Sequence, residues 1–354
     1  IGVPNNGLVT IPISRGSYDG VNYNTMVSTT PGTKDDDNWN LVGNPYPSAI
    51  NALDFLTLNT NIAGFVNIWT HGALPSNATV DPFYNNYAYN YTPTDYLTYN
   101  AVGPSTGPGS GSFNGRIAGG QGFFVSMLHT SLATTENLIF NNSLRNITHN
   151  NNQFYKTVAN NKNAEEFEKH RIWFDIVAPN GASVRSLLGY VEEATNGKDR
   201  LFDAFSNEKL TLNIFSLIEN EQMLIQGRTL PFDNNDKVNI GISVPQEGIY
   251  KIALSSVDGL FSNVNQNIYL EDKLLNVIYD LRTEPYSFTA NKGTINDRFI
   301  IRYNNGVVLA NETFDANTDV VVVSNQELSV VSTKEKIANI IVYDVLGRKL
   351  FEGK

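Results

Sequence analysis

The chain has 354 residues and a mass of 39.2 kDa, a length that predicts roughly two or three domains with substantial cores. Hydrophobic residues make up 41% and charged residues only 17%, which excludes general disorder, and no apolar run approaches the roughly 20 residues that cross a bilayer. The net charge of -10 and the pI of about 4.9 provide no electrostatic basis for nonspecific binding to phosphate backbones, so we expect no nucleic-acid partner.

The residue types favour strands over helices. The sequence has no Cys, which excludes disulfides, thiolate zinc sites and thiol nucleophiles. It has 47 Asn, 17 Tyr and 19 Phe, and Asn favours turns whereas aromatic residues favour half-buried strand surfaces. We therefore predict an all-β fold of short strands joined by tight turns. Because the chain begins with Ile and shows no secretory n-region or h-region, we expect it to be an internal piece of a longer precursor.

Residues 1–148 are predicted to form a loop-rich β-sandwich-like module. Its candidate strands cover residues 8–13, 65–70, 122–127 and 138–141. Ser48, which follows the turn Pro45-Tyr46-Pro47, is expected to cap a short helix over residues 49–56. The three Trp side chains, Trp39, Trp69 and Trp173, are interpreted as core rather than as a ligand platform.

Two stretches of this module are candidate binding sites. Asp35, Asp36 and Asp37 lie in a polar loop and are candidate Ca²⁺ ligands, but the D-x-D-x-D-G loop is absent and a solvated turn is the favoured alternative. Residues 81–99 interleave aromatic side chains with Asn and Asp, a combination that suits sugars because a ring stacks on a pyranose while amides bind its hydroxyls. The candidate glycan-binding residues are Tyr84, Tyr87, Tyr89 and Tyr91. Their alternation equally predicts a strand with inward-facing tyrosines, so both interpretations stay open.

Residues 149–169 are predicted to be a linker, since a run rich in Asn is followed there by a run of charges. Residues 170–305 are predicted to form a β-sandwich module. A hairpin joins residues 171–177 to residues 184–190 through Pro179-Asn180-Gly181. Further predicted strands cover residues 238–244, 250–254, 267–270, 276–281 and 298–303.

No catalytic residue is predicted in the chain. The sequence contains no G-x-S-x-G elbow, no H-E-x-x-H pair and no phosphate-binding glycine loop. The four His residues, His71, His129, His149 and His170, are isolated and are interpreted as structural or solvated. The chain is therefore predicted not to be an enzyme, and no cofactor is expected apart from the Ca²⁺ considered above.

Residues 306–354 are predicted to hold strands at 320–323, 328–331 and 337–343, followed by a tight turn and a returning strand. The motif of this hairpin consists of Tyr343, Asp344, Leu346, Gly347 and Arg348. It resembles the conserved hairpin of the C-terminal sorting domains carried by type IX secretion cargo of Bacteroidota. Residues 41–48, 120–125, 226–228 and 297–299 are similar to modules that precede such domains in large surface proteins. The resemblance implies that residues 306–354 are a partial Ig-like β-sandwich sorting domain, which follows the two β-sandwich-like modules predicted above.

The resemblance also implies a destination and partners. It implies export across the outer membrane through the type IX translocon, recognition by its outer-membrane shuttle protein and cleavage by a sortase-like peptidase. We expect cleavage within the polar stretch 306–319, because a protease needs exposed, extended backbone. The chain would then be the non-catalytic C-terminal part of a secreted cell-surface protein or adhesin. The alternative is a glycan-binding module of a secreted polysaccharide-degrading enzyme, and a surface glycan is a partner that fits both.

Overall fold

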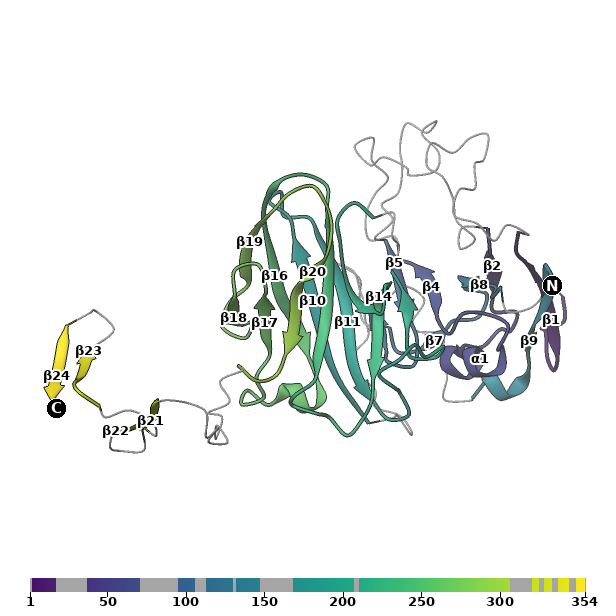
Figure 1. Cartoon of the computed structure of the whole chain (residues 1–354). Coiled ribbons are helices and arrows are strands. Elements are labelled where there is room, and N and C mark those ends of the chain that lie inside the picture. Colours follow the sequence, from purple (N-terminus) through teal and green to yellow (C-terminus); the bar gives the residue numbers. More distant parts are fainter. Residues whose placement is uncertain are drawn as a thin grey trace. The chain divides into compact units, whose positions relative to one another are not determined.

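The computed structural model of the chain describes residues 2–16, 37–70, 95–105, 113–129, 132–146, 168–206, 210–305, 320–324, 328–332, 337–343 and 348–353. The chain forms two compact units, residues Ile1–Asn304 and residues Asn305–Lys354. Strands dominate both units and the described residues include one α-helix, so the predicted all-β fold is confirmed (Figure 1). The predicted linker lies outside the described residues up to residue 167.

In the first half of the larger unit, a five-stranded antiparallel sheet has the strand order β2-β8-β4-β5-β6 (Figure 1). Two further pairs join β1 to β9 and β3 to β7. The bounds are β1 Val9–Ser14, β2 Trp39–Gly43, β3 Ile50–Asn51, β4 Val66–Trp69, β5 Tyr96–Tyr99, β6 Pro104–Ser105, β7 Arg116–Ile117, β8 Gly122–Ser126 and β9 Thr135–Phe140, followed by the 3-10 helix η1 Asn142–Leu144. The four strands predicted in this half are therefore present, with shifted ends.

The helix α1 covers Ala52–Leu58 and starts later than predicted. The prediction that Ser48 caps it is wrong, because Asn51 is the N-cap and its Oδ1 accepts the N–H of Leu53 at 2.9 Å. Pairing of β3 with β7 keeps residues 50–51 extended, which delays the helix start. Phe55 of the helix is fully buried and packs on Phe123 of the sheet, with ring centroids 5.3 Å apart.

The second half of the larger unit is an eleven-stranded sheet in the order β18-β17-β20-β15-β13-β14-β11-β10-β16-β19, with β12 paired to β14. The bounds are β10 Lys169–Val177, β11 Ser183–Val191, β12 Ala204–Phe205, β13 Asn213–Ile218, β14 Glu221–Arg228, β15 Lys237–Val244, β16 Gly248–Val257, β17 Tyr269–Asp272, β18 Val277–Asp280, β19 Tyr286–Ala290 and β20 Gly293–Arg302, with the 3-10 helix η2 at Gly259–Ser262.

The predicted hairpin of this half is confirmed. β10 and β11 pair antiparallel in a register that sets Ile172 opposite Leu188. Gly181 in the connecting turn has φ +84°, a conformation that glycine adopts without steric cost. The strands predicted at 238–244, 250–254 and 298–303 are β15, β16 and the end of β20, and the predicted pair around residues 271–273 is β17 with β18. Short-range alternation and turn chemistry thus located these elements correctly.

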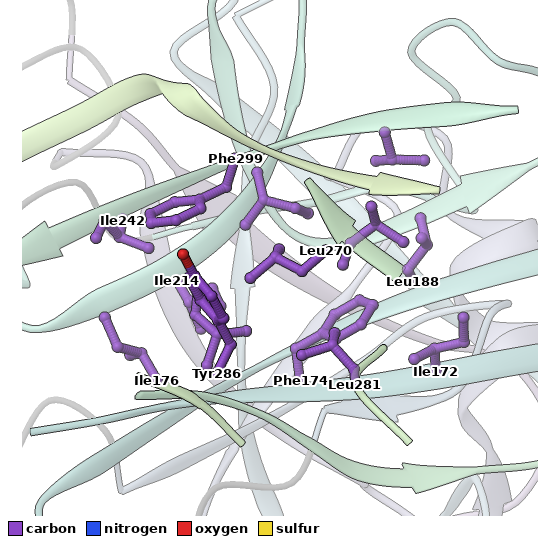
Figure 2. Packing of buried hydrophobic residues seen from close by; sticks show 14 of the residues in the cluster. Ile172, Phe174, Ile176, Leu188, Ile214, Ile242, Leu270, Leu281, Tyr286 and Phe299 are labelled. Atoms are coloured by element: carbon purple, nitrogen blue, oxygen red, sulfur yellow. The ribbon is translucent and has the colours of Figure 1, made fainter. Parts of the chain in front are cut away.

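The sheet folds over a continuous apolar core. Figure 2 shows side chains from both halves of the strand order converging there, among them Phe174 and Ile176 of β10 and Phe299 of β20. Alternate residues of these strands point inward, so burying one face of each half of the sheet creates the sandwich. At the edge of this core, Arg298 donates to Asp272 at 2.7 Å, and Asp272 is fully buried. Burial raises the pKa of that carboxyl, but the hydrogen bonds from Arg298 and Tyr286 outweigh burial and hold it below its usual value.

The two halves of the larger unit meet at a shared apolar cluster. Phe65 and Val102 of the first half contribute to it together with Leu187 and Ile225 of the second. Polar contacts lock the same junction, since the Trp173 indole N–H donates to the Pro104 carbonyl at 3.1 Å. At the far end of α1, the guanidinium of Arg200 donates to the carbonyl of Leu56 at 3.1 Å, a group that a helix terminus otherwise leaves without a partner. Residues 1–304 accordingly pack as one unit.

The smaller unit contains two antiparallel hairpins. β21, Val320–Ser324, pairs with β22, Leu328–Ser332, and β23, Ile340–Tyr343, pairs with β24, Lys349–Gly353. All three strands predicted here are present, and the predicted returning strand is β24. Within the described residues, each hairpin forms a sheet of two strands only.

Candidate functional site

The structure describes two of the five predicted sorting-motif residues. Tyr343 ends β23 and Arg348 immediately precedes β24, and both side chains are exposed. Asp344, Leu346 and Gly347 lie outside the described residues. The β23–β24 ladder slips by one residue between Val342 and Tyr343, so that Tyr343 stands opposite Lys349. The two described motif residues therefore lie at the ends of the paired strands β23 and β24, on either side of residues 344–347 in the chain.

Asp37 is the one predicted calcium ligand that the structure describes, and Asp35 and Asp36 lie outside it. The carboxylate of Asp37 lies 3.9 Å from His129 Nε2, and its backbone carbonyl accepts the N–H of Gly16 at 2.9 Å. Within the described part of the chain, no three His, Asp or Glu side chains gather in a way that could hold a metal ion. A calcium site at residues 35–37 remains a prediction.

The tyrosines predicted to bind glycans, Tyr84, Tyr87, Tyr89 and Tyr91, lie outside the described residues. The strands on either side of them are described. β4 and β5 pair with Trp69 opposite Tyr96, and the Thr70 hydroxyl donates to the Asp95 carboxylate at 2.9 Å. The tyrosine-rich stretch therefore leaves and rejoins the five-stranded sheet at one place.

The outer face of the five-stranded sheet carries exposed aromatic side chains, among them Trp39, which was predicted to lie in the core. One face of these strands is buried, through Val42, Phe123, Val125, Ile68 and Leu97. The alternate positions face the other way and include Trp39, Leu41, Phe124 and Tyr96. Trp39 is 41% exposed, Leu41 66% and Tyr96 38%. Assignment of Trp39 to the core is therefore wrong, whereas Trp173 is partly buried at the junction of the halves.

Cross-strand register brings these outer residues together. Leu41 stands opposite Phe124, and Phe124 stands opposite Asn67. The rings of Tyr96 and Phe124 meet edge to face, with centroids 5.7 Å apart. In sequence these residues belong to four separate strands, β2, β8, β4 and β5, so only pairing of the strands could reveal the surface. We call Trp39, Leu41, Asn67, Tyr96 and Phe124 the outer aromatic face.

Two glycines lie beside the outer aromatic face, and a hydrogen bond orients the Asn67 amide within it. Gly43 and Gly122 stand opposite each other in the β2–β8 pair and expose backbone beside Leu41 and Phe124. The Thr98 hydroxyl donates to Asn67 Oδ1 at 2.8 Å, which fixes the orientation of the amide. The Asn67 amide nitrogen then has no hydrogen-bond partner among the described residues and remains a donor. This side of the sheet thus combines aromatic rings, backbone without side chains at the glycine pair, and an oriented amide group.

A line of rings continues from this face toward the second half. Trp39 lies 6.1 Å from Phe65, and Phe65 lies 6.4 Å from Phe205 of β12, as measured between centroids. Phe65 is buried, whereas Phe205 is 43% exposed and has the Lys198 ammonium 4.5 Å from its ring centroid. Exposed aromatic surface is therefore present on both sides of the junction.

The titratable groups near this junction have structural partners. Asp203 is buried and accepts the backbone N–H of Asp199 at 2.5 Å and of Gly227 at 3.0 Å. Burial raises its pKa to about 7 despite these two bonds. The His170 ring accepts the backbone N–H of Leu260 at 3.1 Å, in agreement with a structural role.

A surface recess of about 640 Å³ lies at the turn between β19 and β20. Lys273, Lys292 and Arg298 are among its lining residues. The Arg298 guanidinium is committed to Asp272 and to the Thr289 carbonyl, the latter at 2.8 Å. Its charge therefore stabilises the sandwich edge.

No helix among the described residues has the length and apolar character that a membrane span requires. No curated protein matches the chain, and no solved structure matches it. Residues 309–354 match the model of a second family, described as a domain of unknown function, DUF8694. Residues 1–303 match the model of a domain of unknown function, DUF8693, so the chain belongs to the DUF8693 family.

Proposed function

We propose that the chain is the non-catalytic C-terminal part of a secreted cell-surface protein or adhesin, and that its terminal unit is a sorting domain for the type IX translocon. The observation that carries the proposal is the pairing of β23 with β24, in which Tyr343 ends one strand, Arg348 precedes the other, and both are exposed. A receptor can reach both side chains without unfolding the hairpin.

The organisation of the chain supports a separate role for the terminal unit. The terminal residues form their own compact unit and match their own family model. The hairpin also exposes Ile341, Leu350 and Phe351. Exposed apolar side chains and unpaired strand edges favour strand addition by a partner protein. An outer-membrane shuttle protein of the translocon is the partner we propose, and a sortase-like peptidase would act in residues 306–319, which lie outside the described residues.

The test is export of the complete precursor in cells with and without a functional type IX translocon. We expect surface display only when the translocon functions. Arg348→Ala and Tyr343→Ala should reduce display, whereas Lys349→Ala, on the same hairpin but outside the motif, should not. Equal display in both strains, or equal effects of all three substitutions, would overturn the proposal.

A second candidate function is a glycan-binding module of a secreted polysaccharide-degrading enzyme. The outer aromatic face favours it, because exposed rings beside an oriented amide are the groups that bind sugars. The tyrosines at 84–91 remain a separate prediction for the same function.

A further inference from the structure

We infer that the outer aromatic face is a binding site for a neutral polysaccharide, which lies across the Gly43–Gly122 pair and stacks on Trp39, Phe124 and Tyr96. The inference deepens the second candidate function and does not depend on how the protein is exported. It places the site on β2, β8, β4 and β5, which pair with one another, and not on Tyr84, Tyr87, Tyr89 and Tyr91.

The exposure of the rings points to a ligand rather than to the core. Soluble proteins rarely leave large apolar side chains side by side on one surface unless the surface binds something. Here Leu41 and Phe124 are cross-strand neighbours, Trp39 lies two residues from Leu41 on the same face, and the Tyr96 ring contacts Phe124. A pyranose presents an apolar C–H face of its own, and flat aromatic rings match that face.

The glycine pair explains how a bulky chain could approach the sheet. Glycine inside a strand weakens packing and often marks a site where another group comes close to the backbone. A Cβ added to Gly122 would meet its nearest neighbour, Leu41 Cδ1, at 3.5 Å, which is an ordinary contact. The fold therefore does not need glycine at this position for space, and Gly122 has no positive φ that would require it.

The polar groups and the charge of the face select the class of ligand. The outward positions of β2, β8, β4 and β5 carry no Asp, Glu, Lys or Arg. A nucleic acid or an anionic polymer would find no cation on this face, and a neutral polymer loses no charge solvation there. The Asn67 amide, fixed by Thr98, offers a donor to a sugar hydroxyl. An amide donor and bare backbone between the rings fit a hydroxylated ligand better than an apolar protein surface.

The test is native affinity electrophoresis of the full chain in gels that contain hydroxyethylcellulose, xylan, laminarin or galactomannan, with alginate as the anionic comparison. We expect at least one neutral polysaccharide to retard the protein and alginate not to. Trp39→Ala should weaken that binding by at least about tenfold, as expected for an aromatic anchor. Gly122→Ala should weaken it while leaving the thermal unfolding midpoint unchanged. The added methyl group fits the fold but fills the space over the backbone where the polysaccharide would lie.

The matched control is Ile249→Ala, since Ile249 is 62% exposed on β16, away from this sheet. It should bind within about twofold of the wild type, as expected for a surface substitution. Binding that survives both Trp39→Ala and Gly122→Ala would overturn this site but keep glycan binding as a function. Retardation by none of the polysaccharides would overturn both. Self-association that Trp39→Ala abolishes would also overturn the inference, because the face would then bind a second copy.

Discussion

The sandwich of residues 168–305 and the terminal unit are both built from antiparallel hairpins with apolar side chains, but they use those side chains differently. In the sandwich, Phe174 and Phe299 are buried, with exposed fractions of 1%. In the terminal unit, Phe351 is 57% exposed and Leu350 65%. The sandwich joins eleven strands in one sheet that folds over itself, whereas each terminal hairpin has two.

The difference shows that alternation creates an apolar face but does not bury it. Burial needs a second layer, and two strands provide none, so an isolated hairpin is marginally stable at best. The same strand chemistry therefore produces stability in the sandwich and an accessible surface in the terminal hairpin. Four predictions test this contrast.

The largest effect is expected from Asp272→Ala. Removal of this carboxylate leaves the buried Arg298 guanidinium without its partner, which should lower the free energy of unfolding by about 3–5 kcal/mol. Urea denaturation followed by Trp fluorescence reports on the larger unit, because all three Trp residues lie in it. Glu221→Ala is the matched control in the same unit: it removes the exposed partner of Lys198 and should produce no measurable change. Equal effects of the two substitutions would show that burial of the Asp272–Arg298 pair does not decide its contribution.

Phe299→Ala should have an effect of similar size for an apolar reason. The ring packs against Phe288 with centroids 4.8 Å apart, and its loss leaves a cavity in the core. We expect a loss of about 3–5 kcal/mol in the free energy of unfolding, measured in the same way. A loss below about 1 kcal/mol would show that the core collapses around the missing ring.

Asp203 should make stability depend on pH. Its pKa of about 7 in the folded protein lies above the ordinary value of 3.8, so the folded state holds the proton more tightly than the unfolded state. The contribution of this residue is complete below pH 3.8 and is lost as pH rises through about 7, by up to about 4 kcal/mol.

The measurement is the free energy of unfolding of the wild type and of Asp203→Asn between pH 4 and pH 8. The wild type should lose stability relative to the variant as pH rises, because the variant has no proton to lose at this position. Parallel pH profiles would show that the buried carboxyl does not titrate in this range.

The smallest effect is expected from Phe351→Ala. Because its ring is exposed, the stability of the terminal hairpin should change by less than about 0.5 kcal/mol, as judged by amide hydrogen exchange of β23 and β24. A large loss of protection would mean that the ring is packed in solution, and would remove the contrast with Phe299.

Sequence reasoning succeeded where local chemistry decides. The β10–β11 hairpin was predictable because apolar alternation meets the turn Asn180-Gly181, and Gly181 adopts the positive φ that the turn requires. The helix was predictable, but its cap was not. Ser48 and Asn51 are both good caps, and the choice between them depends on pairing of β3 with β7, a contact between residues distant in sequence.

The sequence by itself determined the all-β class, most strand positions and the abundance of aromatic residues, because composition and alternation are properties of short segments. Only the tertiary structure decided which aromatic residues are exposed. Trp39 and Phe123 lie in equally apolar strands, yet one is exposed and the other buried. Helix α1 and the β1–β9 pair pack on the face that carries Phe123. The register that aligns Leu41, Phe124 and Asn67 joins strands far apart in the chain.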